Sequence, residues 1–408
     1  MHEATTRSKT RRRFLHTTGI AAAGTLLASS RAAKAKAAGS PGKTYRAAVI
    51  GRTGRGNYGH GLDLVFKNFP NIEIVAVADE NPDGLQEAAQ RTGAKARYAS
   101  YAKMLRDEKP DLVAVAPRWA DPHHDMVLAA AEVGAHIYLE KPMARSLAEA
   151  DAMVDACERR GLKMAIAHQM HLAPVIEETQ RQVENGVIGQ LLEIRGRGKE
   201  DRRAGGEDLM VLGTHVMDLM RLFAGDPQWA WADVTAGGHA IGRDDVRDGN
   251  EGLGLLAGDT IMATYGFGNG VHGFFGSKHN AHGNGGRYGL DLYGSKGVIT
   301  IRSGMDPTVH LFNAPSWAPP KDAAAWKRIE AKESKPKGDG FPAANARLVA
   351  DLLDAIEHDR RPRSSGHDGR AALEMILAVY ASQRAGTRVK LPIEDRRHPL
   401  EAWRRSAG

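Results

Sequence analysis

Short runs of β-branched residues alternate with helical patterns from residue 45 onward, and this alternation constrains the fold more than any other feature of the sequence. The strand-like runs cover residues 47–50, 72–78, 112–116, 136–139 and 163–167. Helical patterns lie between them, at residues 83–91, 101–106, 125–132 and 147–160. Because strands that alternate with helices pair in parallel within one sheet, the sequence predicts a doubly wound α/β domain over residues 45–165.

The second half of the chain has a different pattern, because its strand-like runs are not each followed by a helix. These runs cover residues 191–195, 271–275 and 298–301. Strands of this kind pair mostly in antiparallel orientation, so we expect a large, mainly antiparallel open sheet here. Residues 344–357 have an amphipathic helical pattern, and residues 314–340, rich in Pro, Lys and Ala, are expected at the surface. The sequence therefore predicts a second domain, also α/β, over residues 166–395.

The formal charge of +7 comes entirely from the N-terminal segment. Residues 1–37 hold eight Lys or Arg and one acid, whereas the rest of the chain has 48 basic and 48 acidic residues. A protein that binds nucleic acid normally presents a basic surface on its folded part. We therefore expect no nucleic-acid partner.

The same N-terminal segment has the three parts of an export signal. A basic start is followed by an apolar stretch at residues 17–28 and by small residues near Ala35 and Ala37. The apolar stretch has 12 residues. Because a bilayer requires about 20, we expect no permanent membrane anchor.

Residues 10–15, Thr-Arg-Arg-Arg-Phe-Leu, resemble a twin-arginine export motif, and no Cys follows to accept a lipid. The twin-arginine translocation machinery carries proteins that have already folded. The sequence therefore predicts a signal peptide over residues 1–37, cleavage after Ala37, recognition by this machinery, and a periplasmic or otherwise exported location. An ordinary basic tail is the alternative. Cys157 is the only cysteine, so no disulfide forms within the chain, and a buried structural role is expected for it.

A glycine-rich loop follows the first predicted strand, at residues 51–56. Backbone N–H groups of such a loop bind pyrophosphate at the start of the following helix, which we also expect here. The second predicted strand ends at Asp79, whose carboxylate is placed to accept the ribose hydroxyls of a dinucleotide. Glu80 follows in place of a basic residue, which favours NAD over NADP. The candidate cofactor contacts here are Gly51, Thr53, Gly54, Gly56 and Asp79. Because Thr53 replaces a glycine of the G-x-G-x-x-G pattern, a glycine-rich turn without a ligand is the alternative.

Further motifs resemble those of the glucose-fructose oxidoreductase and inositol dehydrogenase family, usually called Gfo/Idh/MocA. They are Glu140-Lys141-Pro142 after the fourth predicted strand, Gly205-Gly206 and Gly213-x-His215-x-x-Asp218 in the second half, and the segment from Tyr288 to Gly297. With the glycine-rich loop, these landmarks extend over nearly the whole chain after the signal segment. The resemblance implies an N-terminal Rossmann domain that holds a nicotinamide dinucleotide and a second domain that binds a sugar-like polyol.

The resemblance also implies roles for single residues. Glu140, Lys141 and Pro142 would line the nicotinamide end of the cleft together with His123, and the peptide before Pro142 is often cis. Lys141 would contact the reacting hydroxyl, and His215 would exchange its proton. Oxidation of a secondary alcohol requires a base near neutral pKa and a cation that stabilises developing alkoxide, which these two residues supply. The alternatives are a surface lysine and a solvent-facing histidine near a helix N-terminus.

One departure from the family pattern concerns His215. Family dehydrogenases commonly have Asp four residues before this His, where the present chain has Val211. Side chains four residues apart share a helix face, so the usual Asp–His pair is absent. Glu207 or Asp208 is an alternative source of a carboxylate. His171 is a second departure, near a position where the family often has Arg.

A run of polar residues precedes the second-domain motif and supplies candidate contacts to sugar hydroxyls: Lys199, Glu200, Asp201, Arg202 and Arg203. A solvated charged surface is the alternative for these residues. The predicted substrate-binding set is Lys141, Lys199, Arg202, Asp208 and His215. The acids near His215 lack the spacing of a metal site, so no metal is expected.

The leading functional hypothesis is hydride transfer between tightly held NAD and a secondary alcohol of a sugar, glycoside or cyclitol. Because an exported enzyme cannot draw on cytoplasmic NAD, it must restore its cofactor within each cycle. It can do so by coupling the oxidation and reduction of two sugars, or by a transient oxidation that permits cleavage of a glycosidic bond. A non-catalytic sugar-binding protein that retains NAD is the third alternative. We also expect a homo-oligomer, because family members often pair through the open sheet.

Overall fold

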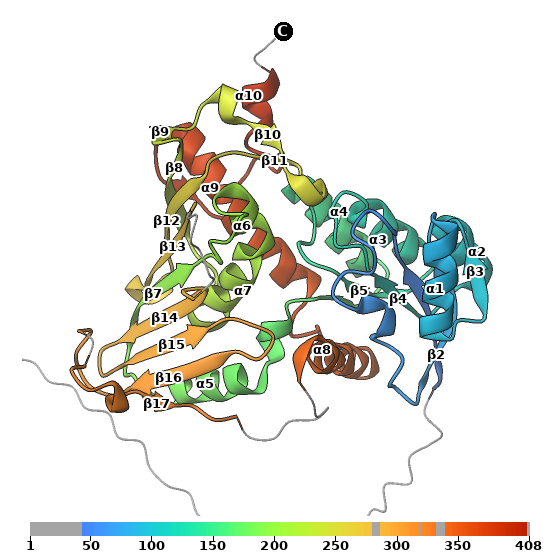
Figure 1. The fold of residues 1–408 in the computed structure, drawn as a ribbon, viewed down its shortest axis with the longest axis horizontal. Coiled ribbons are helices and arrows are strands. Elements are labelled where there is room, and N and C mark those ends of the chain that lie inside the picture. The colour runs from blue at the N-terminus through green and yellow to red at the C-terminus, as the bar shows by residue number, and fades with distance from the viewer. Residues whose placement is uncertain (1–42, 280–285, 319, 332–338, 406–408) are drawn as a thin grey trace, which may run out of the picture. The chain divides into compact units, whose positions relative to one another are not determined.

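The computed structural model describes residues 43–279, 286–318, 320–331 and 339–405. The predicted signal peptide and its cleavage site lie outside the described residues. Two sheets, of six and of ten strands, form the framework of the part that begins at Lys43 (Figure 1). Among the described residues, every helix is too short or too polar to span a bilayer.

The first sheet has six parallel strands in the order β3-β2-β1-β4-β5-β6. They are β1 Tyr45–Ile50, β2 Ile72–Ala78, β3 Ala96–Tyr98, β4 Leu112–Val115, β5 His136–Leu139 and β6 Met164–Ile166. The doubly wound parallel sheet is therefore confirmed. We did not predict β3, because three residues with Arg97 exposed at the centre give too short a pattern. The strand order reverses between β1 and β4, which opens a crevice at the carboxyl ends of these strands.

Helices cover both faces of the first sheet. They are α1 Pro82–Thr92, α2 Tyr101–Glu108, α3 His123–Glu132 and α4 Leu147–Glu158, with α8 Gly340–Glu357 from the far end of the chain. Three of them begin after an N-cap side chain that accepts a backbone hydrogen bond, at Asn81, Ser100 and Ser146. Helices α2, α3 and α4 pack on one face, and α1 and α8 pack on the other. Figure 1 shows α8 beside the first sheet.

The α-helix that we expected after the glycine-rich loop is absent, and this prediction is wrong. Residues 58–71 form turns and one short 3₁₀ helix, η1 Leu62–Leu64. Positive φ angles occur at Gly54, Gly56, Asn57, Gly59 and Gly61. A right-handed helix cannot run through residues in this left-handed conformation. A dinucleotide at this loop therefore has no helix N-terminus beneath its pyrophosphate.

The second sheet has ten strands, in the order β17-β16-β15-β14-β7-β13-β12-β8-β18, with β9 paired to β8. Its strands are β7 Leu191–Arg197, β8 Trp229–Ala236, β9 His239–Ala240, β12 Thr260–Gly266, β13 His272–Lys278, β14 Gly289–Gly294, β15 Val298–Arg302, β16 Thr308–Phe312, β17 Lys327–Arg328 and β18 Val389–Lys390. Within the described residues, β7 and β13 pair in parallel and the other pairs are antiparallel. The prediction of a mainly antiparallel sheet is therefore confirmed.

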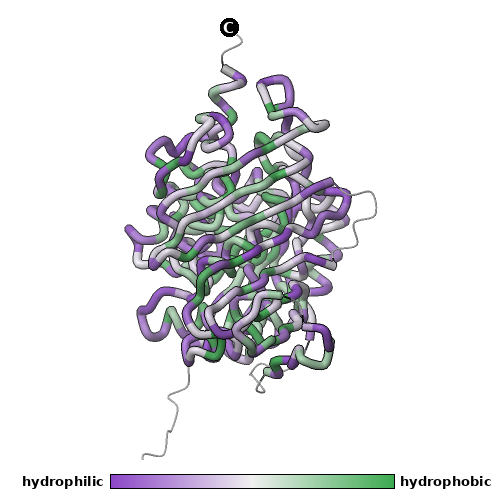
Figure 2. The backbone as a smooth tube through the Cα atoms, turned by 90° about the vertical axis from the view of Figure 1, so that its left-hand side faces the viewer, coloured by the Kyte–Doolittle hydropathy of each residue, from purple (hydrophilic) through white to green (hydrophobic). Residues whose placement is uncertain are grey.

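Helices pack on one face of the second sheet, as Figure 1 shows for α6, α7 and α9. The helices of this half are α5 Pro174–Glu184, α6 Gly206–Val211, α7 Gly213–Ala224, α9 Gly366–Ala385 and α10 Glu401–Arg405. Shorter elements are η2 Gln169–Leu172, η3 Arg243–Asp245, η4 Asn250–Gly252, η5 Gly268–Gly270, η6 Ala323–Ala325 and the two-stranded pair β10 Arg247–Asp248 with β11 Leu255–Leu256. Figure 2 looks onto the other face, where the strands themselves lie in front.

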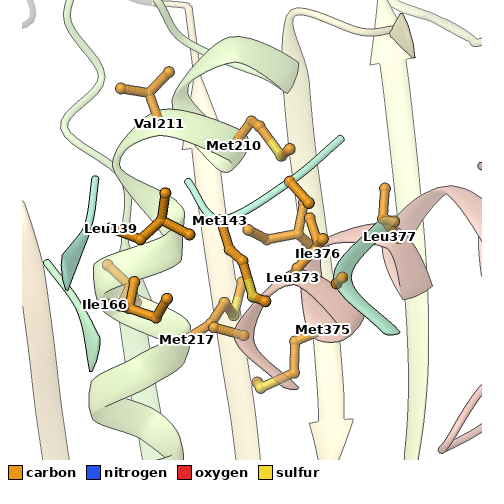
Figure 3. Close-up of a cluster of buried hydrophobic side chains, with 14 of the residues drawn as sticks. Leu139, Met143, Ile166, Met210, Val211, Met217, Leu373, Met375, Ile376 and Leu377 are labelled. Carbon is orange, nitrogen blue, oxygen red and sulfur yellow. The ribbon is translucent and has the colours of Figure 1, made fainter. Parts of the chain in front are cut away.

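The two domains share an apolar core. Leu139 of β5 and Ile166 of β6 belong to the same buried cluster as Met217 of α7 and Leu373 of α9, with Met143 among them (Figure 3). This core packs the first sheet against α7. It therefore fixes the position of the turn after β5 relative to α7. Cys157 is also buried here, as expected, and burial raises the pKa of its thiol to about 12.

Candidate active site

Asp79 shapes the glycine-rich loop at the carboxyl end of β1. Its carboxylate accepts hydrogen bonds from Thr53 N at 3.0 Å, Thr53 Oγ1 at 2.7 Å and Asn81 N at 2.9 Å. Asp79 is only 2% exposed. The loop therefore depends on this acid for its shape, and the contact of Asp79 with ribose hydroxyls stays a prediction.

The outer side of the loop leaves room for a ligand. A Cβ added at Gly54, where φ is +84°, would have no atom within 4 Å. A Cβ added at Gly56, where φ is +88°, would lie 2.5 Å from the backbone nitrogens of Arg118 and Trp119, so this part of the loop packs on the turn after β4. An open glycine surface at the switch point between β1 and β4 fits the pyrophosphate of a dinucleotide.

His123 is buried inside the protein, so its predicted contact with the cofactor is wrong. Its Nδ1 lies 3.0 Å from Pro142 O, and its Nε2 lies 2.7 Å from Pro117 O. The residue is 0% exposed. Because both ring nitrogens face main-chain carbonyls, His123 ties the turn after β4 to the turn after β5 and reaches no ligand.

The turn after β5 carries Glu140, Lys141 and Pro142, and the Lys141–Pro142 peptide is cis, as the resemblance implies. The buried Glu140 carboxylate pairs with His60 and accepts a hydrogen bond from Lys141 N at 3.1 Å. Burial opposes its ionisation, but the charges of His60 and Lys141 hold the pKa of Glu140 below its ordinary value. We did not predict His60, because it lies in the segment for which we expected a helix.

Lys141 is 3% exposed, and its Nζ donates to Val211 O at 3.2 Å. Burial lowers the pKa of Lys141, although Glu140 and Glu251 act in the opposite direction. A buried ammonium group that is bonded to a neutral carbonyl gains strongly from a nearby negative charge. Lys141 can therefore stabilise an oxygen on which negative charge develops.

His215 lies in the first turn of α7 and is 8% exposed. Its Nδ1 is buried without a hydrogen-bond partner in the described part of the chain. Burial, together with the positive charge of Lys141, holds the pKa of His215 well below its ordinary range. The imidazole is therefore neutral near pH 7 and can accept a proton.

Behind His215 lies a buried cluster of His168, His171 and Asp218. The Asp218 carboxylate lies 2.9 Å from His171 Nδ1 and 3.4 Å from His168 Nδ1. His168 Nε2 lies 2.9 Å from Thr214 Oγ1, and the rings of His168 and His215 meet edge to face at 5.5 Å. The motif acid Asp218 thus bonds to His171, lies within ion-pair distance of His168, and makes no hydrogen bond to His215 in the described structure. We missed His168; its only sequence signal is its place directly after the fifth predicted strand.

Neither Glu207 nor Asp208 supplies the carboxylate that Val211 lacks. Glu207 accepts a hydrogen bond from Arg247 Nη1 at 3.1 Å. Asp208 is fully buried and accepts bonds from the backbone N–H groups of residues 199 and 200 at 3.1 and 3.0 Å. The predicted substrate contact of Asp208 is therefore wrong, because its carboxylate holds this loop instead.

Val211 has two separate roles. Its side chain is 2% exposed and belongs to the shared apolar core, where Figure 3 places it near the end of α6. Its carbonyl accepts the hydrogen bond of Lys141. Val211 therefore contributes to the site through its main chain. Since its side chain is apolar, it gives His215 no carboxylate partner, and no other described carboxylate lies in hydrogen-bond contact with His215.

Lys141 and His215 line one cavity of about 200 Å³. Its lining consists of His60, Arg118, Lys141, Gln169, Met170, Lys199, Arg203, Val211, Leu212, His215, Tyr288, Gly304, Met305 and Phe341. Lys199 is thus at the cavity as predicted. Arg202 is exposed and outside the lining, so its substrate contact stays a prediction; the neighbouring Arg203 is among the lining residues.

A dinucleotide crevice on a doubly wound sheet, next to a cavity with a buried lysine and a neutral histidine, defines a nicotinamide-dependent oxidoreductase. Residues 45–168 match the family profile described as "Oxidoreductase family, NAD-binding Rossmann fold", and residues 180–391 match "Oxidoreductase family, C-terminal alpha/beta domain". The chain belongs to the Gfo/Idh/MocA oxidoreductase family. Its first domain binds NAD.

Similar proteins include two sugar dehydrogenases. D-apiose dehydrogenase of Paraburkholderia graminis is 26% identical over 86% of this chain and 90% of that protein. Levoglucosan dehydrogenase of Pseudarthrobacter phenanthrenivorans is 26% identical over 65% of this chain and 73% of that protein.

Solved structures share the fold. A levoglucosan dehydrogenase in complex with NADH and levoglucosan has a TM-score of 0.67 at 22% identity, over 86% of this chain and 100% of that one. An aldose-aldose oxidoreductase from Caulobacter crescentus, complexed with glycerol, has a TM-score of 0.65 at 20% identity, over 85% and 100%.

Proposed function

We propose that this protein transfers hydride between a tightly held NAD and a secondary alcohol of a sugar, glycoside or cyclitol. One observation carries the proposal: a buried ammonium group and a neutral, unpartnered imidazole line the same small cavity. The similarity to levoglucosan and D-apiose dehydrogenases supports a sugar as the substrate.

Each of the two residues has a distinct task. Lys141 Nζ donates to the reacting oxygen and stabilises the negative charge that develops there. His215 removes the hydroxyl proton, and Nε2 is its acceptor because Nδ1 is fully buried. His168 lies against the His215 ring and fixes its orientation. NAD, when bound to the loop after β1, supplies the hydride acceptor.

Substitution of the two residues tests this assignment. Lys141→Ala and His215→Ala are each expected to lower turnover by about 10²–10⁴-fold while the protein retains NAD, since neither residue belongs to the pyrophosphate loop. Absorbance at 340 nm reports turnover, and NAD released by denaturation reports retention. Lys296→Ala and His272→Ala, which change exposed residues outside the cavity, are the matched controls. Variants of Lys141 and His215 that keep most of their activity refute the assignment.

Cleavage of a glycoside through a transient ketone is the second candidate. The observation that favours it is the valine at position 211. A simple polyol dehydrogenase is expected to have a carboxylate bonded to this histidine, and no described carboxylate bonds to His215. In this reaction the hydride removed at the first step returns at the last, and water replaces the glycosidic group. Product analysis separates the candidates: a cleaved glycoside without net NADH identifies the second.

We further propose export through the twin-arginine pathway, with maturation after Ala37, on the basis of residues 1–37. Replacement of Arg11 and Arg12 by Lys is expected to keep the protein in the cytoplasm, as measured by cell fractionation. N-terminal sequencing of the exported protein tests the cleavage site. An unchanged location in the double variant contradicts this route.

Pairing of two copies through the open face of the second sheet is a related proposal. Large apolar side chains on β8, β12 and β13 are exposed there: Trp231 by 42%, Met262 by 57% and Phe274 by 38%. A cluster of this kind is typical of a protein interface. Native mass spectrometry tests it, and Met262→Lys is expected to shift the protein toward the monomer.

A further inference from the structure

The charged groups that line the cavity all have the same sign. Arg118, Lys141, Lys199 and Arg203 carry positive charge, and His60 and His215 add two imidazoles. Among the described residues the lining contains no Asp and no Glu. Sites for neutral sugars usually include acceptors for the hydroxyl protons, and carboxylates are the strongest of these. Gln169, Tyr288 and the two imidazoles are the uncharged side-chain acceptors of this lining, so its charged groups suit an anion better than a neutral sugar.

Nearby acids compensate only part of this positive charge. Asp201 serves two cations: Arg203 Nη2 lies 2.7 Å from its carboxylate, and Lys199 Nζ lies 3.6 Å from it. Arg118 Nε lies 3.2 Å from Glu251. Lys141 donates to a neutral carbonyl oxygen, and Glu140, which pairs with His60, offsets part of its charge.

The two guanidinium groups retain free donors. Arg203 uses Nε and Nη2 on Asp201, and its Nη1 has no partner among the described residues. For Arg118, neither Nη atom has a hydrogen bond in the described structure, while Nε faces Glu251. Both arginines line the same cavity as Lys141 and His215. These cations therefore converge on the position of the reacting group.

We propose that the substrate is a sugar acid, whose carboxylate binds Arg203 and Arg118 while its reacting hydroxyl faces Lys141 and His215. This inference rests on the proposed function. Guanidinium groups match the planar carboxylate better than ammonium does, and they remain charged at any working pH. Lys199, whose side chain is 43% exposed, lies at the rim and attracts the acid from solvent.

Matched sugars that differ at C6, with and without a negative charge, test the proposal on the holoenzyme. We would compare D-glucuronate with D-glucose, D-galacturonate with D-galactose, and each uronate with its neutral methyl ester. Calorimetry measures binding, and absorbance at 340 nm measures reduction of the bound cofactor in a single turnover. At least one uronate is expected to bind ten-fold or more tightly than both its neutral hexose and its ester.

Variants locate the preference. Arg203→Gln and Lys199→Gln are expected to weaken binding of the acid and to move the ratio of acid to neutral affinity toward one. Arg195→Gln is the control, because Arg195 is exposed on the open sheet and lies outside the cavity. Loss of the preference in the control, or its full retention in both cavity variants, overturns the assignment.

The outcomes separate this proposal from the function on which it rests. Equal binding of acids and neutral sugars overturns the sugar-acid proposal and leaves hydride transfer intact. Preferential binding of an acid, without reduction of the cofactor by any sugar, supports the charge argument and refutes the proposed function.

Discussion

Replacement of Asp218 by Asn tests whether the buried cluster behind His215 is an ion pair. Asp218 is 1% exposed, and its carboxylate lies 2.9 Å from His171 Nδ1. Burial opposes charge on both residues, but their mutual attraction lowers the pKa of Asp218 and raises the pKa of His171. Removal of one partner from a buried pair leaves the other charge uncompensated and costs about 3–5 kcal/mol. We expect a loss of this size in the free energy of unfolding near pH 5.5.

The pH dependence gives a second, independent check. A histidine whose folded pKa is raised above 6.5 stabilises the protein below pH 6.5, and this contribution is lost as the pH rises through the folded value. Asp218 has a lowered pKa, so it stays ionised throughout this range and adds no pH dependence of its own. The difference between the wild type and Asp218→Asn is therefore expected to be largest near pH 5.5 and to shrink above neutral pH.

Urea unfolding, followed by tryptophan fluorescence at pH 5.5 and 8.5, measures both effects. The control is Asp291→Asn, which removes a partly exposed pair with Arg302 and is expected to cost less than about 1 kcal/mol at either pH. A loss for Asp218→Asn that equals the control at pH 5.5, or one that grows with pH, refutes the buried ion pair.

Three further predictions concern the site. Gly56→Ala forces a Cβ into left-handed backbone, 2.5 Å from two backbone nitrogens, and is expected to weaken NAD binding at least ten-fold by calorimetry; unchanged affinity contradicts the placement of the loop. Val211→Asp puts a carboxylate into the apolar core and is expected to lower the free energy of unfolding by about 3 kcal/mol or more in urea titrations, without a gain in turnover. Because burial lowers the pKa of His215, the value of kcat/KM for alcohol oxidation is expected to show no fall centred near pH 6.5. Because burial also lowers the pKa of Lys141, the fall of kcat/KM at alkaline pH is expected to be centred below pH 10.5.

The parallel sheet was predictable because each of its longer strands contains an uninterrupted run of apolar residues and is bounded by turn residues. The helix after the glycine-rich loop was not, because the run of left-handed residues at 54–61 depends on contacts that the spacing of glycines does not reveal. The same error concealed His60, which reaches Glu140 from this segment. The pattern of apolar residues therefore predicted the strands of the first domain. It failed at residues 54–61, where contacts with other parts of the chain determine the backbone conformation.

Single residues of the site show the limits of motif reasoning. Lys141 and His215 were identified through the resemblance, and the structure brings them into one cavity. His123 and Asp208 are polar residues at the right place in the chain, yet His123 faces main-chain carbonyls and Asp208 accepts from main-chain N–H groups and from Ser277 Oγ. Whether a polar side chain faces a ligand or the backbone depends on tertiary packing, which no spacing encodes. Arg118 was missed because nothing near it in the sequence distinguishes it from surface arginines.

The packing of α8 has a consequence for the order in which the protein can assemble. Leu348 and Leu352 of this helix share a buried cluster with Ala47 and Val49 of β1, about 300 residues earlier in the chain. A ribosome must therefore synthesise almost the entire protein before this face of the first sheet is shielded from water. A fragment that ends near residue 168 lacks α8 and would expose the apolar side chains of this face that α8 covers. The nucleotide-binding domain is thus not a complete unit without α8. A chimaeric protein that contains this domain must include α8 as well.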